Sequence, residues 1–170
     1  GVTAPKGFLA ASTAAGIKYK DRSDMAMIYS TVPCKAAGTF TTNVVKAAPV
    51  LYDKKIVKES KSVQAVVVNA GIANACTGAQ GYENVVTEAK EVAKLLDIKP
   101  EEVVVGSTGV IGQQLPMDVI KEGIKRLVPE LKADRQSEED ASWAILTTDT
   151  KPKEAAVEVE INGKTVTIAG

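Results

Sequence analysis

Ser62-Val-Gln-Ala-Val-Val-Val-Asn69 is an almost continuous apolar run with a polar residue at its end. Such a valine-rich run is typical of a strand buried in the middle of a sheet. Residues 82–96 then change to helical spacing, with apolar side chains on one face and charged ones on the other. Glu102-Val-Val-Val105 predicts the next strand. Strands that alternate with helices predict an α/β fold.

Further strands are expected on both sides of this unit. Met25–Val32 ends at a proline, and Thr39–Val45 is rich in β-branched residues. Residues 1–20 are expected to form an irregular lead-in. Near the other end, Ala155–Ile161 and Lys164–Ile168 flank an Asn-Gly pair, which predicts a hairpin. Because no linker or repeat interrupts the chain, residues 1–170 are expected to form a single α/β domain.

Two more helices are expected after residue 112. Pro116 suits the first turn of a helix whose apolar side chains are Val119, Ile120, Ile124, Leu127 and Val128. Ser137, followed three residues later by Asp140, resembles the start of the second of these helices. The acidic pairs Glu101-Glu102 and Glu138-Glu139 are expected on exposed faces rather than in acid–base chemistry.

The composition excludes several classes of function. The chain has 21 Lys+Arg, 21 Asp+Glu and no histidine. A net charge of zero gives no electrostatic footprint for nucleic acid or an anionic membrane, and without histidine the chain has no Ser-His-Asp relay and no His metal ligand. Cys34 and Cys76 fit no zinc pattern, so both are expected to be small buried hydrophobes in a reducing compartment. No apolar run approaches the ~20 residues of a membrane span, so we expect a cytoplasmic protein.

Three segments are richer in glycine and small polar residues than packing requires. They are Asn69–Gly78, Gly106–Gly112 and Leu146–Thr150. Gly106–Gly112 lacks the Gly-Lys-Ser/Thr ending of a phosphate loop, but the Thr108 hydroxyl and the Gly109 N–H could form an oxyanion hole. From the residues alone, an ordinary strand-to-helix connection or glycine-rich turn is favoured for the first two segments. A helix terminus explains the third segment equally well.

Taken together, these segments resemble a known family. The chain contains, in this order, Val2–Phe8, Phe40–Asn43 with Ala47–Pro49, Asn69–Gly78, Ser107–Gly112 and Thr147–Thr150. This series is similar to the bifunctional ornithine acetyltransferase / glutamate N-acetyltransferase family of arginine biosynthesis, and the similarity extends over essentially the whole chain. The resemblance implies mixed sheets packed with helices, in a two-chain architecture related to that of certain aminopeptidases.

The resemblance also implies a mechanism. Members of the family are precursors that cleave themselves before a threonine, which becomes the N-terminal nucleophile of a β chain. An N-terminal amine can activate its own hydroxyl, so no histidine is needed. The threonine takes the acetyl group from N-acetylornithine and passes it to glutamate in a ping-pong reaction that needs no cofactor. Some members also use acetyl-CoA to acetylate glutamate.

This chain resembles the α chain of such a precursor. The resemblance implies an obligate β-chain partner and a heterotetramer of two α and two β chains. Thr108 and Gly109 match the oxyanion-hole pair of the family, and Thr147 matches a substrate-binding threonine, with Thr148 and Thr150 as nearby alternatives. Asn69–Gly78 matches a block expected to support the site. No metal ligand is expected.

Two other functions remain open at this stage. A self-processing N-terminal-nucleophile aminopeptidase would use the same nucleophile but pass the acyl group to water. A small-ligand binding module without enzyme activity is also compatible with a neutral chain that has glycine-rich loops.

Overall fold

The computed structural model describes residues 1–170 and has the mixed α/β architecture that the sequence predicts. Its main sheet has the strand order β1-β2-β3-β4. The first two pairs are antiparallel and β3 pairs with β4 in parallel, so the sheet is mixed. These strands are β1 (Phe8–Thr13), β2 (Met25–Cys34), β3 (Val63–Ile72) and β4 (Val103–Val110).

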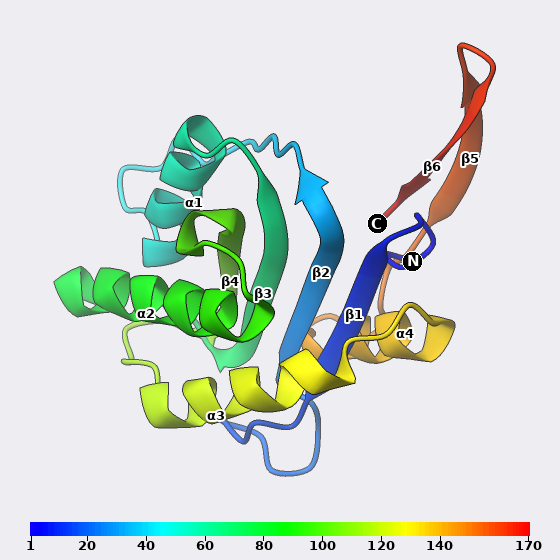
Figure 1. Cartoon of the computed structure of the whole chain (residues 1–170). Helices are drawn as coiled ribbons and strands as arrows, with labels where there is room; N and C mark the ends of the chain where they lie inside the picture. The colour runs from blue at the N-terminus through cyan, green and yellow to red at the C-terminus, as the bar shows by residue number, and fades with distance from the viewer.

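Helices cover the two faces of this sheet unequally (Figure 1). α1 (Ala48–Glu59), α2 (Gly78–Leu96) and α3 (Met117–Leu127) lie on one face, and α4 (Arg135–Ala144) packs on β1 and β2 from the other. Short 3-10 turns, η1 (Pro100–Glu102) and η2 (Val128–Glu130), precede β4 and follow α3. The sheet is therefore fully covered on one face and only partly on the other.

The main core lies between the sheet and α1–α3. Alternate strand residues point into it because successive side chains of a strand face opposite ways. The fully buried members include Met25, Met27, Val67, Val103, Val105, Ile120, Ile124 and Leu127. Burying each such side chain contributes about 1.5–3 kcal/mol. Residues on the opposite face of the sheet, among them Ile28, Val66 and Val68, stay only half-buried.

The first 60 residues differ from the expected elements in three places. The lead-in contains a strand, β1, which is stabilised by pairing with β2 along its whole length. Residues 39–45 form no strand, because no neighbouring strand pairs with them and Asn43 Oδ1 instead accepts a local hydrogen bond from the Val45 N–H. α1 has no counterpart among the expected helices, and Pro49 occupies its first turn.

Other differences concern boundaries and exposure. β4 continues to Val110, because the predicted glycine-rich loop pairs with the end of β3. The helix-capping residue of α4 is Asp134, which accepts a hydrogen bond from the Ser137 N–H at 2.7 Å, and not Ser137 itself. The cysteines are less buried than expected: Cys34 is half-buried and Cys76 is exposed.

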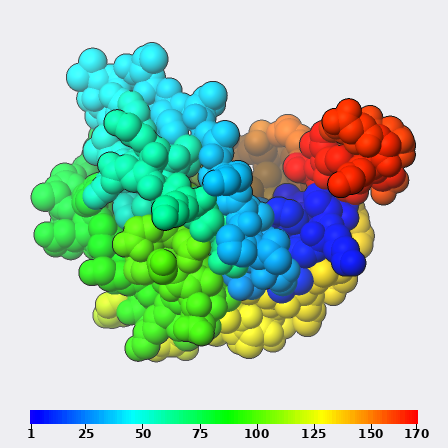
Figure 2. Space-filling view, turned by 45° about the horizontal axis from the view of Figure 1, so that its top comes forward, coloured from blue at the N-terminus to red at the C-terminus, as the bar shows by residue number.

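The predicted hairpin is confirmed and stands apart from the body. β5 (Ala156–Ile161) pairs with β6 (Lys164–Ala169), and both turn residues between them have positive φ. Figure 2 shows the hairpin, in red, projecting from one side of the molecule. None of the helices combines the length and the apolar character that crossing a lipid bilayer requires.

Candidate active site at the carboxyl ends of β3 and β4

At the carboxyl ends of the two parallel strands, two glycines lie directly opposite each other. Thr108 and Gly109 of β4 lie opposite Ala70 and Gly71 of β3. Gly109 has a φ of 132°, and a Cβ at this position would overlap the carbonyl carbon and oxygen of Gly71. Only glycine therefore fits here. The Gly109 backbone remains exposed, and a ligand can approach it closely.

Ser107, the residue before Thr108, holds the end of β4 in place through two hydrogen bonds. The Ser107 hydroxyl accepts a hydrogen bond from the Asn74 N–H at 2.8 Å and donates to the Ile72 carbonyl at 3.3 Å. The buried Asn74 side chain accepts in turn from the Thr77 hydroxyl at 2.6 Å. No such bond within the chain engages the Thr108 hydroxyl. The segment around Asn74 thus anchors the end of β4, whereas the Thr108 hydroxyl is not used in this network.

A loop between β1 and β2 forms the second wall of the site. It lies at the lower edge of the sheet in Figure 1, in blue. The buried Asp24 carboxylate accepts hydrogen bonds from three successive backbone N–H groups, of Ala15 at 2.7 Å, Gly16 at 3.1 Å and Ile17 at 2.7 Å. Since three charge-assisted bonds hold it, this loop has a defined conformation.

The loop places Lys18 and Tyr19 directly over the end of β3. A Cβ at Gly71, where φ is 102°, would lie 2.9 Å from the Cβ of Lys18 and 3.2 Å from a ring carbon of Tyr19. Glycine at this position therefore allows the loop to lie close to the strand. Because Gly71 is the strand partner of Gly109, Lys18 and Tyr19 are brought next to the exposed end of β4.

Arg22 connects the same loop to the segment after α4. Its guanidinium group donates hydrogen bonds to the carbonyls of Leu146 at 2.6 Å and Trp143 at 3.2 Å. The guanidinium carbon also lies 4.7 Å from the centre of the Tyr19 ring, within the range of a cation–π interaction. These contacts hold residues 147 and 148 beside the loop.

The ends of β3 and β4, the loop between β1 and β2, and the segment after α4 together line an open hollow of about 410 Å³. The lining residues are Lys18, Tyr19, Gly71, Thr108, Gly109, Val110, Thr147 and Thr148. The structure thus brings together Thr108, Gly109 and Thr147, which the sequence singled out from segments almost 40 residues apart. Thr148 also lines the hollow, whereas Thr150 does not. Lys18 and Tyr19 also line the hollow but are not indicated by the sequence, because nothing in the expected lead-in shows that Asp24 folds it over Gly71.

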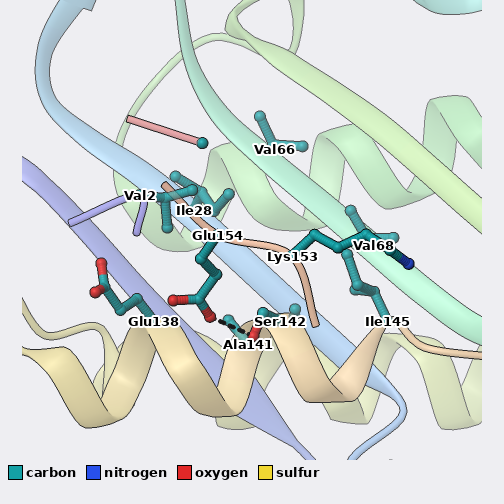
Figure 3. A pocket seen from close by; sticks show the side chains of 12 residues that line it. Val2, Ile28, Val66, Val68, Glu138, Ala141, Ser142, Ile145, Lys153 and Glu154 are labelled. Atoms are coloured by element: carbon teal, nitrogen blue, oxygen red, sulfur yellow. Dashed lines mark hydrogen bonds between the residues drawn. The ribbon is translucent and has the colours of Figure 1, made fainter. Parts of the chain in front are cut away.

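A second hollow, of about 150 Å³, lies between α4 and the half-buried face of β2 and β3 (Figure 3). Ile28, Val66 and Val68 line it from the strands, and Ile145 lines it from the end of α4. It is mostly apolar and contains neither Thr108 nor Gly109. We therefore treat it as an uncovered part of the sheet and not as the reactive site.

Glu138, at the edge of this apolar hollow, is buried and not exposed as expected. Burial raises the pKa of this carboxyl, but hydrogen bonds from the Thr3 hydroxyl and N–H and from Arg135 outweigh it and lower the pKa to about 2. A carboxylate held in its ionised form by three donors has a structural role. No three His, Cys, Asp or Glu side chains lie close enough together to hold a metal ion.

Comparison with known proteins gives a consistent result. The sequence pattern described as the ArgJ family matches residues 9–170. The chain is 49% identical to the arginine biosynthesis bifunctional protein ArgJ of Thermotoga neapolitana, over 98% of this chain and 41% of that protein. The protein of the same name from Symbiobacterium thermophilum is also 49% identical, over 99% of this chain and 42% of its own length. The chain thus spans about two fifths of these relatives.

Two solved structures share the fold. The crystal structure of the arginine biosynthesis bifunctional protein ArgJ of Bacillus halodurans has a TM-score of 0.94 and 41% identity, over 99% of this chain and 87% of that one. The ornithine acetyltransferase of Mycobacterium tuberculosis, solved in complex with ornithine, has a TM-score of 0.92 and 40% identity, over 100% of this chain and 90% of that one.

Proposed function

The chain belongs to the ArgJ family, and we propose that it contributes the oxyanion-stabilising half of an acetyltransferase active site in arginine biosynthesis. The proposed reaction transfers the acetyl group of N-acetylornithine to glutamate. The observation that carries the proposal is the hollow in which Thr108, Gly109 and Thr147 meet. The names of the relatives and the ornithine bound to the M. tuberculosis structure support the same chemistry.

In the proposed mechanism, the hydroxyl of an N-terminal threonine on a second chain attacks the acetyl carbonyl. The carbonyl oxygen becomes negatively charged, and the Thr108 hydroxyl and the Gly109 N–H donate hydrogen bonds to it. As the tetrahedral intermediate collapses, the C–N bond breaks and the proton from the attacking hydroxyl goes to the departing amine of ornithine. The amine of glutamate then attacks the acetyl-enzyme ester, and the same two donors act again. The ester C–O bond breaks, and a proton from the attacking amine returns to the threonine oxygen. Stabilisation of this kind typically contributes ~10²–10³ in rate for each donor.

Thr147 lines the hollow from the segment after α4 and, in this proposal, contacts the amino-acid part of the donor. Thr148, which lines the same wall, is the alternative. No metal and no organic cofactor enters the exchange, because one amide is converted into a similar amide. The free energy of the two bonds is nearly the same, so no ATP is needed.

The uncovered surfaces of the chain support a second chain as an obligate partner. On the hairpin, Val157 pairs with Ile168 and Val159 pairs with Val166, so all four side chains share one exposed face. The half-buried face of β2 and β3 adds further apolar area. Patches of this kind mark interaction surfaces. We propose that residues 1–170 act as one α/β domain, completed by the β chain of the same cytoplasmic precursor across more than ~2,000 Å², and that two such pairs form a heterotetramer.

The test uses the full-length precursor, purified and incubated with N-acetylornithine labelled in the acetyl group. With glutamate present and no coenzyme A, we expect labelled N-acetylglutamate and free ornithine in equal amounts. Release of labelled acetate instead would indicate transfer to water, as in an aminopeptidase, and unchanged substrate would refute the enzyme assignment. Mass spectrometry of the co-purifying chain should show an N-terminal threonine.

A further inference from the structure

We propose that Lys18 forms a carboxylate subsite in this hollow and binds the α-carboxylate that the donor and acceptor amino acids share. The inference rests on the proposed function for the identity of the ligand. It goes beyond that function in assigning a binding role to a residue outside every glycine-rich or threonine-rich segment.

The position of Lys18 is the first argument. Its Cβ and Cδ lie 2.9 Å and 3.6 Å from where a Cβ of Gly71 would be, so the stem of the side chain rests on the end of β3. Gly71 is the direct strand partner of Gly109, and neighbouring strands lie ~4.8 Å apart. The flexible four-carbon stem of lysine therefore starts about one strand spacing from the proposed oxyanion hole.

The charge of the hollow is the second argument. Lys18 is the only charged residue among the eight that line it, and its ammonium group forms no ion pair. Two nearby acids are already engaged: the Asp24 carboxylate binds backbone N–H groups, and Asp149 pairs with Lys153 at 3.0 Å. Asp21 of the same loop does not line the hollow. Arg22 adds a second positive charge beside Tyr19. The lining of the hollow therefore carries a net positive charge.

The chemistry of the substrates is the third argument. In N-acetylornithine, the carbon attached to the reacting amide nitrogen also carries the carboxylate. The attacking amine of glutamate is attached to the same kind of carbon. When the acetyl carbonyl lies at Thr108 and Gly109, the carboxylate lies a few bonds away in both half-reactions. One cation at the position of Lys18 can therefore bind both substrates, whose side chains carry opposite charges.

The experiment measures ligand binding in the assembled wild-type protein and in three variants. Lys18→Met removes the charge and keeps much of the stem, Lys18→Arg keeps the charge, and Lys20→Met is the control, since Lys20 is exposed and lies outside the hollow. Calorimetry gives the affinity of each protein for ornithine and for putrescine, which is ornithine without its carboxylate. Kinetics then gives KM and kcat for N-acetylornithine and glutamate.

We expect Lys18→Met to weaken ornithine binding about tenfold, as the loss of one partly exposed charge-assisted bond does, and to leave putrescine binding unchanged. KM should rise for both substrates with little change in kcat, Lys18→Arg should recover most of the affinity, and Lys20→Met should match the wild type. Equal losses for ornithine and putrescine, a KM rise confined to glutamate, or no difference between Lys18→Met and Lys20→Met would each overturn the subsite. If ornithine binding depends on Lys18 but no acetyl group is transferred, the subsite stands and the proposed function fails.

Discussion

The two halves of the parallel pair β3–β4 differ in burial and in the size of their side chains. In the first half, Ala65, Val67, Val103 and Val105 are almost completely buried under the helices. In the second half, Gly71 and Gly109 meet backbone to backbone, and the Thr108 hydroxyl has no partner in the chain. The first half stabilises the fold through burial, whereas the second leaves polar groups uncovered. One continuous pair of strands is thus a core element at one end and, in our proposal, a binding element at the other.

Gly109→Ala should have the largest effect, because its Cβ would overlap the backbone of Gly71. We expect at least a ~10³-fold loss of kcat in acetyl transfer, since the Gly109 N–H would be displaced from the oxyanion. Gly112→Ala is the matched control: its φ is also positive, at 79°, but nothing lies within 4 Å of its Cβ. Equal activities for the two variants would show that the close approach of the strands has no part in the reaction.

The next largest expected effect is the change that pH causes in the free energy of unfolding through Glu88. It lies in α2, which covers the buried half of the pair, and its Oε1 has no hydrogen-bond partner. Burial raises the pKa of this carboxyl from 4.5 to about 8. Between these two pH values the unfolded chain releases the proton and the folded chain keeps it, so the free energy of unfolding should fall with rising pH, by on the order of 4 kcal/mol.

Glu88→Gln should remove the part of this dependence that Glu88 contributes, because glutamine does not titrate, and leave the smaller part that comes from Asp53, whose carboxyl pKa burial raises to about 6. Urea unfolding of both proteins at pH 4.5 and at pH 8 measures it. A wild-type stability that stays constant over this range would contradict the buried, protonated state of Glu88.

Val105→Ala should have the smallest effect, and only on the fold. Val105 is 1% exposed and packs in the main core. Removing two methyl groups should lower the free energy of unfolding by about 2 kcal/mol and leave kcat within about twofold of the wild type. A large loss of kcat in this variant, with little loss of stability, would break the division between the two halves.

Local patterns in the sequence account for the buried half of this pair, but only partly for the elements around it. Residues 62–69 and 82–96 are predicted correctly because their own periodicity matches their final environment. β1 is missed because its small residues become a strand only through pairing with β2. Residues 39–45 have strand-like composition but no partner strand, and Val44 is 93% exposed.

Local sequence patterns likewise indicate only part of the candidate site. Thr108, Gly109 and Thr147 lie in segments whose glycine and hydroxyl content is visible in the sequence, so they could be singled out. Lys18 and Tyr19 could not, since their place depends on hydrogen bonds from the loop to Asp24 and on the contacts of Arg22 with the end of α4. Such long-range contacts leave no periodic pattern along the chain.

The kcat/KM for acetyl transfer by Thr108→Ala, compared with Thr108→Ser and the wild type, tests the central claim most directly. The Thr108 hydroxyl stabilises nothing within the chain, so Thr108→Ala should lower kcat/KM by ~10²–10³ and change the free energy of unfolding by less than about 0.5 kcal/mol. Thr108→Ser, which keeps the hydroxyl, should retain most of the activity. Full activity in Thr108→Ala would show that the Thr108 hydroxyl does not stabilise the oxyanion.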